Sequence, residues 1–333
     1  MASSDTPEPG HAGRVLVTGG AGFIGATLIR MLLQRGWAVT VLDDFSVGAR
    51  DRLADLPVQI IEGNILDSAT VREAIRGHQA VVHLAAQTGV PISLDDPRRD
   101  CEINVLGTLN VLEGCREEQQ ALANQGGAHG APRMVLASSN APLGRQTPPV
   151  TEDMAPLPVS PYGASKLACE GYCLAYNGSW GLGTVVLRFA NVYGPYSTHK
   201  SSVVAKFMKD VLEGRGITIH GDGTQTRDFI HVSDLSRAVI CALESEASGE
   251  VFQIATGIET SIRELAALLQ DVAGRDLNID HGDSRQGDVD RNVSVVAKAR
   301  DVLGWAPQIS LVDGLKDTWD WWVNSGPVSR GAR

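Results

Sequence analysis

The sequence predicts an α/β protein built on a doubly wound parallel sheet, followed by a smaller mixed α/β domain. Two observations lead to this prediction. From Val15 to Arg188, short apolar segments alternate with longer segments of helical pattern, and strands separated by helices form parallel sheets that are covered on both faces. Beyond Arg188 the pattern becomes less regular, which indicates a second domain.

Each expected strand of the large sheet is a short run of apolar residues. The expected strands are 15–17, 38–42, 58–62, 80–84, 133–137 and 183–188. The expected helices between them are 26–35, 68–75, 101–119 and 164–179. A strand at 251–254 and an amphipathic helix at 262–273 are expected farther along the chain, and residues 121–132, rich in Gly and Ala, are expected to form a surface loop.

Length, composition and charge are typical of a soluble globular protein. The chain has 333 residues, of which 43% are hydrophobic and 20% charged, enough for a large domain and a smaller one. The net charge of −10 argues against general binding to nucleic acid, whose phosphates require a basic face. The five cysteines include no CxxC pair, which argues against a disulfide framework or a zinc site and suits a reducing compartment.

The sequence shows neither a secretory signal in residues 1–13 nor an apolar run long enough to cross a bilayer. We therefore expect a cytoplasmic protein with no membrane and no nucleic acid among its partners. Residues 1–13 are expected to be a disordered tail and 326–333 a second tail.

The first expected strand leads into a glycine-rich turn, VLVTGGAGFIG, with glycines at Gly19, Gly22 and Gly25. Such a turn lets the backbone approach a phosphate, and the free N–H groups of the following helix face the negative charge. Glycine clusters also form ordinary βα turns, so this motif alone is weak evidence for a dinucleotide site.

The cofactor is indicated by an acidic residue about twenty positions after the turn. Asp43 ends the second expected strand, where a carboxylate binds the adenosine ribose of NAD and repels the 2′-phosphate of NADP. No arginine follows immediately, so the sequence favours NAD. The neighbouring Asp44 could instead be a helix cap or turn residue.

The segment SPYGASK places Tyr162 and Lys166 four residues apart, on one face of an expected helix. A tyrosine with an ordinary pKa of about 10 is a poor base at neutral pH. A lysine ammonium one turn away and a cationic nicotinamide ring would favour the phenolate. The serines Ser138 and Ser139 at the end of the fifth expected strand strengthen this interpretation.

With these motifs the sequence resembles the extended short-chain dehydrogenase/reductases, the NAD-dependent epimerases and dehydratases of nucleotide sugars. The matching segments, in order, are TGGAGFIG, HLAAQ, EINVLGTLNVLE, SPYGASK, RFANVYGP, GDGTQTRDFIHVSDL and RQGD, and they cover about residues 14–324. The resemblance implies a Rossmann domain for NAD at 14–188 and roughly 229–255. It implies a nucleotide-sugar domain at 189–228 and 256–325.

The resemblance also implies roles for single residues. Those implied to bind NAD are Gly19, Gly22, Phe23, Ile24 and Gly25 at the pyrophosphate, Asp43 at the ribose, Asn64 and Ile65 at the adenine, Leu84, Ala85 and Ala86 along the channel, and Tyr162 and Lys166 near the nicotinamide. Those implied to approach the substrate are Thr88, Ser139, Asn140, Asn191, Arg227, Arg285 and Asp288. Arg227 could instead form a structural ion pair, and Asp288 a loop turn.

The implied reaction is 4-epimerisation of a UDP-hexose, in which Tyr162 removes the proton of the sugar 4-hydroxyl, assisted by Lys166 and Ser139. Dehydratases of the family carry an Asp-Glu pair after the catalytic Thr, whereas Asn140 and Ala141 follow Ser139 here. Without an acid to protonate the leaving C6 hydroxyl, dehydration is disfavoured. An epimerase acts through one base, so it needs fewer groups.

The sugar is left open between several alternatives. Glucuronate epimerases that resemble this chain have a Thr at the position of Asn191 and an Arg at the position of Thr198, so a neutral hexose or its N-acetyl form is favoured. The segment SSNAPLG also departs from the usual Val-Tyr pair, with Pro142 and Leu143 in its place. The alternatives are an epimerase for UDP-glucuronate or a CDP- or TDP-sugar, a dehydratase or decarboxylase, and a non-catalytic dinucleotide sensor. A homodimer formed through the helices of 101–119 and Tyr162 is also implied.

Overall fold

The computed structural model describes residues 13–124, 132–283 and 290–325. The chain divides into two compact units: unit 1 comprises Met1–Gly144, Pro156–Arg188 and Val239–Phe252, and unit 2 comprises Arg145–Ala155, Phe189–Ala238 and Gln253–Arg333. Relative to the expected domains, residues 145–155, 229–238 and 253–255 group with unit 2. Pairing within that unit gives the reason for two of these segments, because Val150 bonds to Val293 and residues 229–231 pair with 191–193.

The large sheet has seven strands in the order β11-β6-β5-β4-β1-β2-β3. Their bounds are β1 (Gly13–Thr18), β2 (Trp37–Asp43), β3 (Gln59–Glu62), β4 (Ala80–His83), β5 (Arg133–Ser139), β6 (Thr184–Phe189) and β11 (Glu250–Ile254). The pairs β1–β2, β1–β4, β2–β3 and β4–β5 are parallel. The predicted doubly wound α/β fold is therefore confirmed.

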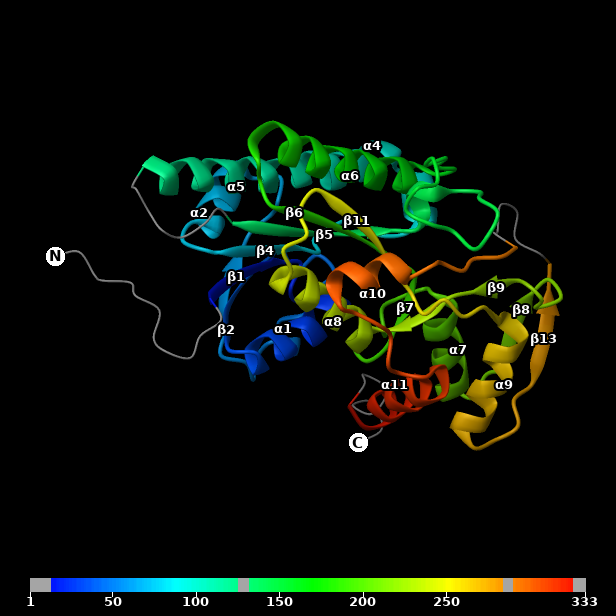
Figure 1. The fold of residues 1–333 in the computed structure, drawn as a ribbon. Helices are drawn as coiled ribbons and strands as arrows, with labels where there is room; N and C mark the ends of the chain where they lie inside the picture. Colours follow the sequence, from blue (N-terminus) through cyan, green and yellow to red (C-terminus); the bar gives the residue numbers. More distant parts are fainter. Residues whose placement is uncertain (1–12, 125–131, 284–289, 326–333) are drawn as a thin grey trace. The chain divides into compact units, whose positions relative to one another are not determined.

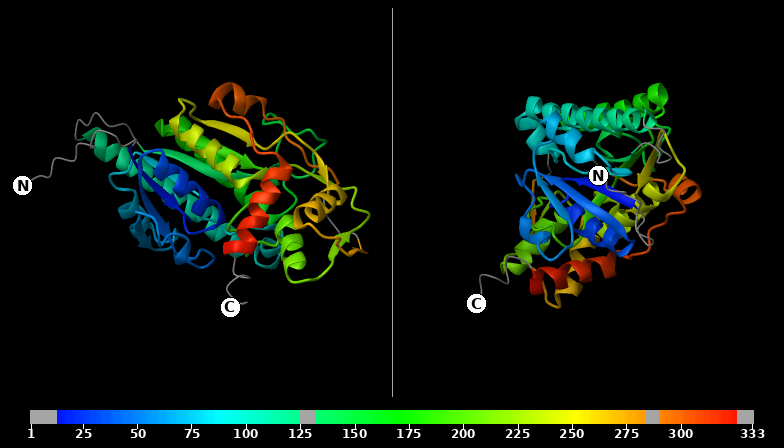
Figure 2. Two further views of the ribbon diagram at one scale, coloured as in Figure 1. Left: turned by 90° about the horizontal axis from the view of Figure 1, so that it is seen from below. Right: turned by 90° about the vertical axis from the view of Figure 1, so that its left-hand side faces the viewer.

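Helices cover both faces of this sheet. Those of unit 1 are α1 (Phe23–Gln34), α2 (Ser68–Ile75), α3 (Val90–Asp95), α4 (Pro97–Cys101), α5 (Gly107–Asn124) and α6 (Pro161–Trp180), with short 3-10 turns at Arg50–Arg52 and Ala141–Leu143. In Figure 1, and in the right-hand view of Figure 2, α5 and α6 lie on one side of the strands and α1 lies on the other. Of the expected surface loop, α5 takes up residues 121–124, and 125–131 lie outside the described residues.

A hydrophobic core packs against α2, α5 and α6. Its side chains recur along each helix and strand at intervals that place them on one face of that element. It includes Leu16 and Leu42 from the sheet, Val71 from α2, Val111 from α5 and Cys173 from α6, all fully buried. The ends of α6 follow from its sequence. The hydroxyl of Ser160 accepts the N–H of Gly163, and Gly181 terminates the helix in the left-handed conformation.

The structure corrects one expected helix. Instead of a continuous helix over 101–119, α4 leads into a π-helical turn, Glu102–Leu106, and only then into α5. A π-helical turn inserts one residue into the helical ladder and is frequent at functional sites. Asn104 lies buried within this turn.

Unit 2 contains short strands in three pairs and a cluster of helices. The pairs are β7 (Asn191–Tyr193) with β10 (Phe229–His231), β9 (Thr226–Arg227) with β12 (Thr260–Ser261), and β8 (Ile217–His220) with β13 (Ile279–Gly282). The helices are α7 (Val203–Leu212), α9 (Ile262–Ala273), α10 (Ala297–Leu303) and α11 (Leu311–Ser325), and α8 (Val232–Glu244) follows β10. The expected helix 262–273 is confirmed and begins with a capping box of Ser261 and Glu264.

The core of unit 2 lies between α7, α9 and α11, which Figure 1 shows side by side. Phe207, Met208, Leu265 and Trp322 are among its buried members. Within the described part of the chain, no helix combines the length and the apolarity that a membrane span requires.

Candidate cofactor and catalytic site

The candidate residues of unit 1 follow the carboxyl ends of five neighbouring strands. In the order of the sheet, Ser139 ends β5, Leu84 follows β4, Gly19 follows β1, Asp43 ends β2 and Asn64 comes shortly after β3. Because parallel strands end at the same edge, these residues form a row along one edge of the sheet, the place where this fold class binds its ligands. An extended ligand lying along this edge would meet all five.

The glycine turn is too tight for side chains at its central positions. Gly19 has a φ of 69°, and a Cβ there would lie 2.7 Å from the backbone nitrogen of Ala85. A Cβ on Gly25 would lie 2.5 Å from the backbone oxygen of Gly20. The backbone can therefore take this course only because these residues are glycines.

The same turn leads directly into the N-terminus of α1. Gly22 is the N-cap and contributes no side chain, and the first turn contains no acidic residue. The N–H groups of Phe23, Ile24 and Gly25 lack intrahelical acceptors, as at every helix start, and the helix dipole places partial positive charge there. This cradle fits the pyrophosphate of a dinucleotide.

Asp43 is held in place by its own loop. Its Oδ2 accepts the N–H of Ala21 at 2.9 Å and its Oδ1 accepts the N–H of Phe45 at 2.8 Å. The side chain is 8% exposed, and burial raises its pKa above the ordinary value although both hydrogen bonds act in the opposite direction. The carboxylate keeps further lone pairs, and these could accept a ribose hydroxyl.

The two residues expected near the adenine differ in their surroundings. Asn64 donates to Asp44 Oδ2 at 2.8 Å, so Asp44 belongs to a local polar cluster. Ile65 is buried, and a Cβ on Gly107 would lie 2.4 Å from its Cδ1. Ile65 therefore packs tightly on the start of α5.

Leu84, Ala85 and Ala86 are partly buried after β4, and Thr88 is exposed. The residue before them, His83, is buried between two threonines, with Nδ1 2.7 Å from Thr18 Oγ1 and Nε2 3.1 Å from Thr108 Oγ1. Burial and the charge of Lys166 lower the pKa of His83 to about 3, so this imidazole is neutral. It ties β1 and β4 to α5.

Ser139, Tyr162 and Lys166 meet at the junction of β5 and α6. The hydroxyl of Ser139 is close enough to that of Tyr162 to lower its pKa by hydrogen bonding. Lys166 is 4% exposed and its Nζ donates to the carbonyl of Ala137 at 3.0 Å. Asn140 starts the 3-10 turn, and the N–H of Ala141 donates to Ser139 Oγ at 3.2 Å, so this hydroxyl also has a backbone donor.

The expected effect of Lys166 on Tyr162 is not found in the chain alone. Burial raises the pKa of Tyr162 to about 12, the hydrogen bond from Ser139 acts in the opposite direction, and Asp100 and Cys169 raise the pKa further. Lys166 itself has a lowered pKa because it is buried, and its ammonium is turned to the Ala137 carbonyl. Tyr162 and Lys166 lie one turn apart on α6, and in the chain alone burial is the largest influence on the pKa of Tyr162.

A buried ion pair lies next to the junction of β5 and α6. Arg188 Nη2 lies 2.7 Å from Glu170 Oε2, with side chains 4% and 3% exposed. The hydroxyl of Ser138 donates to Glu170 Oε1 at 2.6 Å. Glu170 follows Lys166 by one helical turn and Ser138 precedes Ser139, so the pair connects β5, β6 and α6.

In unit 2, two of the predicted substrate residues, Asn191 and Arg227, adjoin Asp228. Asn191 donates through both its backbone N–H and its Nδ2 to the carbonyl of Asp228, at 3.0 and 3.2 Å. Arg227 precedes Asp228 on β9. The Asp228 carboxylate accepts the N–H and Oγ1 of Thr256 and the N–H of Gly257. Arg285 and Asp288 lie outside the described residues.

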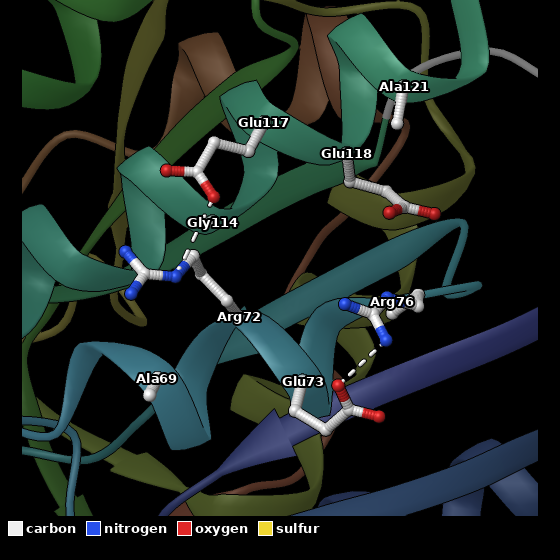
Figure 3. A pocket seen from close by; sticks show the side chains of 8 residues that line it. All are labelled: Ala69, Arg72, Glu73, Arg76, Gly114, Glu117, Glu118 and Ala121. Carbon is white, nitrogen blue, oxygen red and sulfur yellow. Dashed lines mark ion pairs between the residues drawn. The ribbon is translucent and has the colours of Figure 1, made fainter.

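A charged groove between α2 and α5 is separate from the predicted residues. It has a volume of about 420 Å³. Its lining consists of Ala69, Arg72, Glu73, Arg76, Gly114, Glu117, Glu118 and Ala121, none of which is a predicted site residue. Figure 3 shows Arg72 paired with Glu117 across the groove and Arg76 paired with Glu73 along α2. The side chains of the first pair are 43% and 45% exposed and those of the second 68% and 70%, and exposed pairs contribute little to stability.

Sequence reasoning missed the residues that surround Tyr162 from the side of α4 and the π-helical turn. Asp100, Asn104 and Ser165 are buried there and joined by hydrogen bonds. Asn104 and Ser165 lie inside segments already quoted for other reasons. Only the spacing of four between Asp100 and Asn104 could have indicated that they meet.

Comparisons with known proteins agree with this geometry. The sequence profile of the NAD dependent epimerase/dehydratase family matches residues 15–255. A UDP-glucose 4-epimerase of Mycolicibacterium smegmatis is 37% identical over 320 residues, which cover 93% of this chain and 99% of that protein. Other relatives, at 33% and 32% identity, are a UDP-glucuronate 4-epimerase of Thermodesulfobacterium geofontis and a dTDP-glucose 4,6-dehydratase of Streptomyces niveus.

Solved structures show the same fold. A UDP-glucose 4-epimerase of Thermotoga maritima with UDP-glucose has a TM-score of 0.85 and 34% identity, covering 93% of this chain and 98% of that one. The Thermus thermophilus UDP-glucose 4-epimerase in complex with NAD has a TM-score of 0.83 and 35% identity, covering 94% and 99%.

Proposed function

The chain belongs to the NAD dependent epimerase/dehydratase family, and we propose that it interconverts the C4 epimers of a UDP-hexose, UDP-glucose and UDP-galactose or their N-acetyl forms. The observation that carries this proposal is the group of Ser139 and Tyr162, with Lys166 one turn along α6, at the same sheet edge as the glycine cradle.

NAD is the cofactor of this family, and the cradle of unit 1 fits it. When bound, NAD supplies a positively charged nicotinamide ring that accepts the C4 hydrogen of the sugar as hydride and returns it. Phe23, Ile24 and Gly25 hold the pyrophosphate through backbone N–H groups, and Asp43 accepts the ribose hydroxyls. Asn64, Ile65 and Leu84 to Ala86 flank the rest of the dinucleotide.

Tyr162 takes the proton of the sugar 4-hydroxyl and later returns a proton to the same oxygen. Ser139 holds that oxygen by a hydrogen bond, and Lys166 holds the nicotinamide ribose. Because burial keeps the pKa of Tyr162 at about 12 in the chain alone, an added positive charge beside the phenol is needed before it can act as a base near neutral pH.

Two features favour epimerisation of a neutral sugar over the alternatives. Asn140 and Ala141 stand after Ser139, so no carboxylic acid is available there to protonate a leaving C6 hydroxyl. Thr198 stands where glucuronate epimerases that resemble this chain have an arginine.

The nucleoside diphosphate is bound in unit 2 by Asn191, Arg227, Arg285 and Asp288. The two arginines suit this ligand, since guanidinium groups match phosphate oxygens.

Unit 1 is accordingly the NAD-binding domain and unit 2 the nucleotide-sugar domain of a cytoplasmic homodimer. For the dimer, the supporting observation is a set of exposed apolar side chains before α5 and along α6: Leu106, at 49%, in the turn before α5, and Tyr172, Leu174 and Trp180, at 41%, 38% and 48%, on α6. Exposed apolar groups on neighbouring helices are suited to packing against a second copy.

The test is mass-resolved chromatography of the purified protein, without added cofactor, incubated separately with UDP-glucose, UDP-N-acetylglucosamine and UDP-glucuronate. A new peak of unchanged mass from one of the first two supports the proposal and names the sugar. Such a peak from UDP-glucuronate alone would reassign the substrate. A product lighter by one water would identify a dehydratase, and no change with any of the three would remove the UDP-hexose assignment.

A further inference from the structure

We propose that Asp100, a buried carboxylate on α4, is a positioning residue that sets the ionisation of the Tyr162–Lys166 pair. This inference rests on the proposed function for its catalytic meaning, since Tyr162 must first take a proton and then give one back. A phenolate that forms too easily is a poor acid in the second half of that cycle. Burial raises the pKa of Asp100 itself, and its negative charge, once present, opposes ionisation of the phenol.

The placement of Asp100 is unusual for a surface helix. Its side chain is fully buried, while the preceding residues of α4 are exposed. Its Oδ1 accepts Asn104 Nδ2 at 3.1 Å, and the Ser165 hydroxyl also faces the carboxylate. Its Oδ2 has no hydrogen-bond partner of ordinary geometry within the described part of the chain. A buried carboxylate with so few donors is costly, so packing alone does not account for an acid here.

Asp100 does not serve as the cap of its own helix. Asp96 fills that position, accepting the N–H of Arg99 at 2.9 Å. The side chain of Asp100 therefore does not cap α4, and its Oδ1 instead accepts a hydrogen bond from Asn104 in the π-helical turn.

A chain of hydrogen bonds connects Asp100 to the backbone that carries Tyr162. The N–H of Gln87 donates to Asn104 Oδ1 at 2.8 Å, which fixes the orientation of this amide. Its Nδ2 then faces Asp100 Oδ1 and Ser165 Oγ, the latter at 3.0 Å. Ser165 Oγ in turn donates to the carbonyl of Tyr162 at 3.1 Å. Asn104 Nδ2 also lies 3.1 Å from the carbonyl of Gln87, so three acceptors share its two hydrogens, and the network connects α4 to α6.

The charges that face the pair come from several elements. Asp100 raises the pKa of Tyr162 and also that of Lys166, as a nearby negative charge must. The thiol of Cys169 acts in the same direction on both. Glu170 and Cys173 act on Lys166, but Glu170 is already paired with Arg188. His83 is neutral, since its pKa is about 3. Asp100 is therefore the one carboxylate named here that acts on both members of the pair.

The experiment is a spectroscopic titration of the holoenzyme with retained NAD. Phenolate absorbance near 295 nm is followed against pH, and the signal of Tyr162 is isolated by subtracting the same titration of the Tyr162→Phe variant in each background. In Asp100→Asn the amide oxygen can still accept from Asn104, while the charge is gone. The midpoint of Tyr162 is expected to fall by about one unit, the low end of the shifts that a nearby charge produces.

The matched control is Asp96→Asn, which removes a charge from the same helix but keeps the cap, and which should leave the midpoint unchanged. An unchanged or higher midpoint in Asp100→Asn, or an equal fall in Asp96→Asn, would overturn the proposal. If Asp100→Asn does not fold, Asp100→Ser, which also offers an acceptor to Asn104, takes its place under the same criteria. The titration needs no substrate, so it stands apart from the UDP-hexose test: a protein inactive on every sugar could still show the shift, and an active epimerase could lack it.

Discussion

The two halves of the candidate site in unit 1 are built in different ways. Around Gly19 and Gly25 the ligand-facing groups belong to the backbone, and the turn is held by contacts between residues close in the sequence or on adjacent strands. Around Tyr162 the groups are side chains, and their positions depend on Asp100, Asn104 and Glu170 from several helices. A local motif therefore marks the first half as a candidate, whereas the properties of the second half depend on tertiary structure.

The largest expected effect concerns the half of the site around Tyr162, where the functional groups are side chains. Tyr162→Phe removes the proton carrier, so turnover should fall by about 10²- to 10⁴-fold, while bound NAD, measured by its release on denaturation, should stay near the wild-type amount. Tyr172→Phe, an exposed tyrosine on the same helix, is the control and should retain activity. Turnover of Tyr162→Phe close to that of the wild type would remove Tyr162 from the mechanism.

The buried ion pair of Arg188 and Glu170, which lies next to that half of the site, should also contribute to stability. Replacing Arg188 by Met leaves the buried carboxylate of Glu170 without its ion partner, which typically costs about 3–5 kcal/mol. Urea unfolding should show this loss together with reduced turnover. Arg76→Met removes an exposed ion pair on α2 and should change the free energy of unfolding by less than about 1 kcal/mol. Equal losses in the two variants would contradict the assigned role of the buried pair.

A substitution in the half of the site around Gly19 and Gly25 should act by weakening the binding of the cofactor. Gly19→Ala forces a side chain into the left-handed region and against Ala85, which costs about 1–3 kcal/mol and displaces the turn. We expect most of the NAD to be lost on purification. Gly178→Ala, within α6 where a Cβ meets open space, should keep the cofactor and raise stability by up to about 1 kcal/mol. Full NAD occupancy in Gly19→Ala would show that the turn tolerates a side chain.

A pH-dependent effect concerns His83, which lies between the two halves. Its pKa is about 3 in the folded protein and about 6.5 in the unfolded chain, so the unfolded chain binds the additional proton as pH falls below 6.5. The free energy of unfolding should therefore decrease from pH 6.5 toward pH 3, by at most about 1.4 kcal/mol per pH unit from this group. In His83→Asn this part of the slope should disappear, and an unchanged slope in chemical denaturation would assign it elsewhere.

The comparison also shows what the sequence could predict. The alternation of strands and helices and the turn at Gly19 follow from local pattern, and the structure confirms the sheet that they predict. The pair Tyr162 and Lys166, with Ser139, could be identified because helical spacing and a strand end fix which residues meet. Their electrostatics could not, since burial raises the pKa of Tyr162 more than spacing alone would indicate.

Elements whose pattern is not regular were harder to predict. The π-helical turn at Asn104 has no periodic signature, so the helix was expected to be continuous and the contact with Asp100 was missed. In unit 2 most strands have only two to four residues, too few to show an alternating pattern. Their pairing follows from contacts such as those of Asp228, which no local pattern predicts.

The most direct test of the central claim uses UDP-glucose that carries deuterium at C4, converted by the purified protein without added cofactor. If the C4 hydrogen leaves and returns within one enclosed site, the UDP-galactose formed should keep the deuterium at C4, and its mass should equal that of the labelled substrate. Loss of the deuterium to solvent, or a product lighter by one water, would contradict the proposed 4-epimerisation.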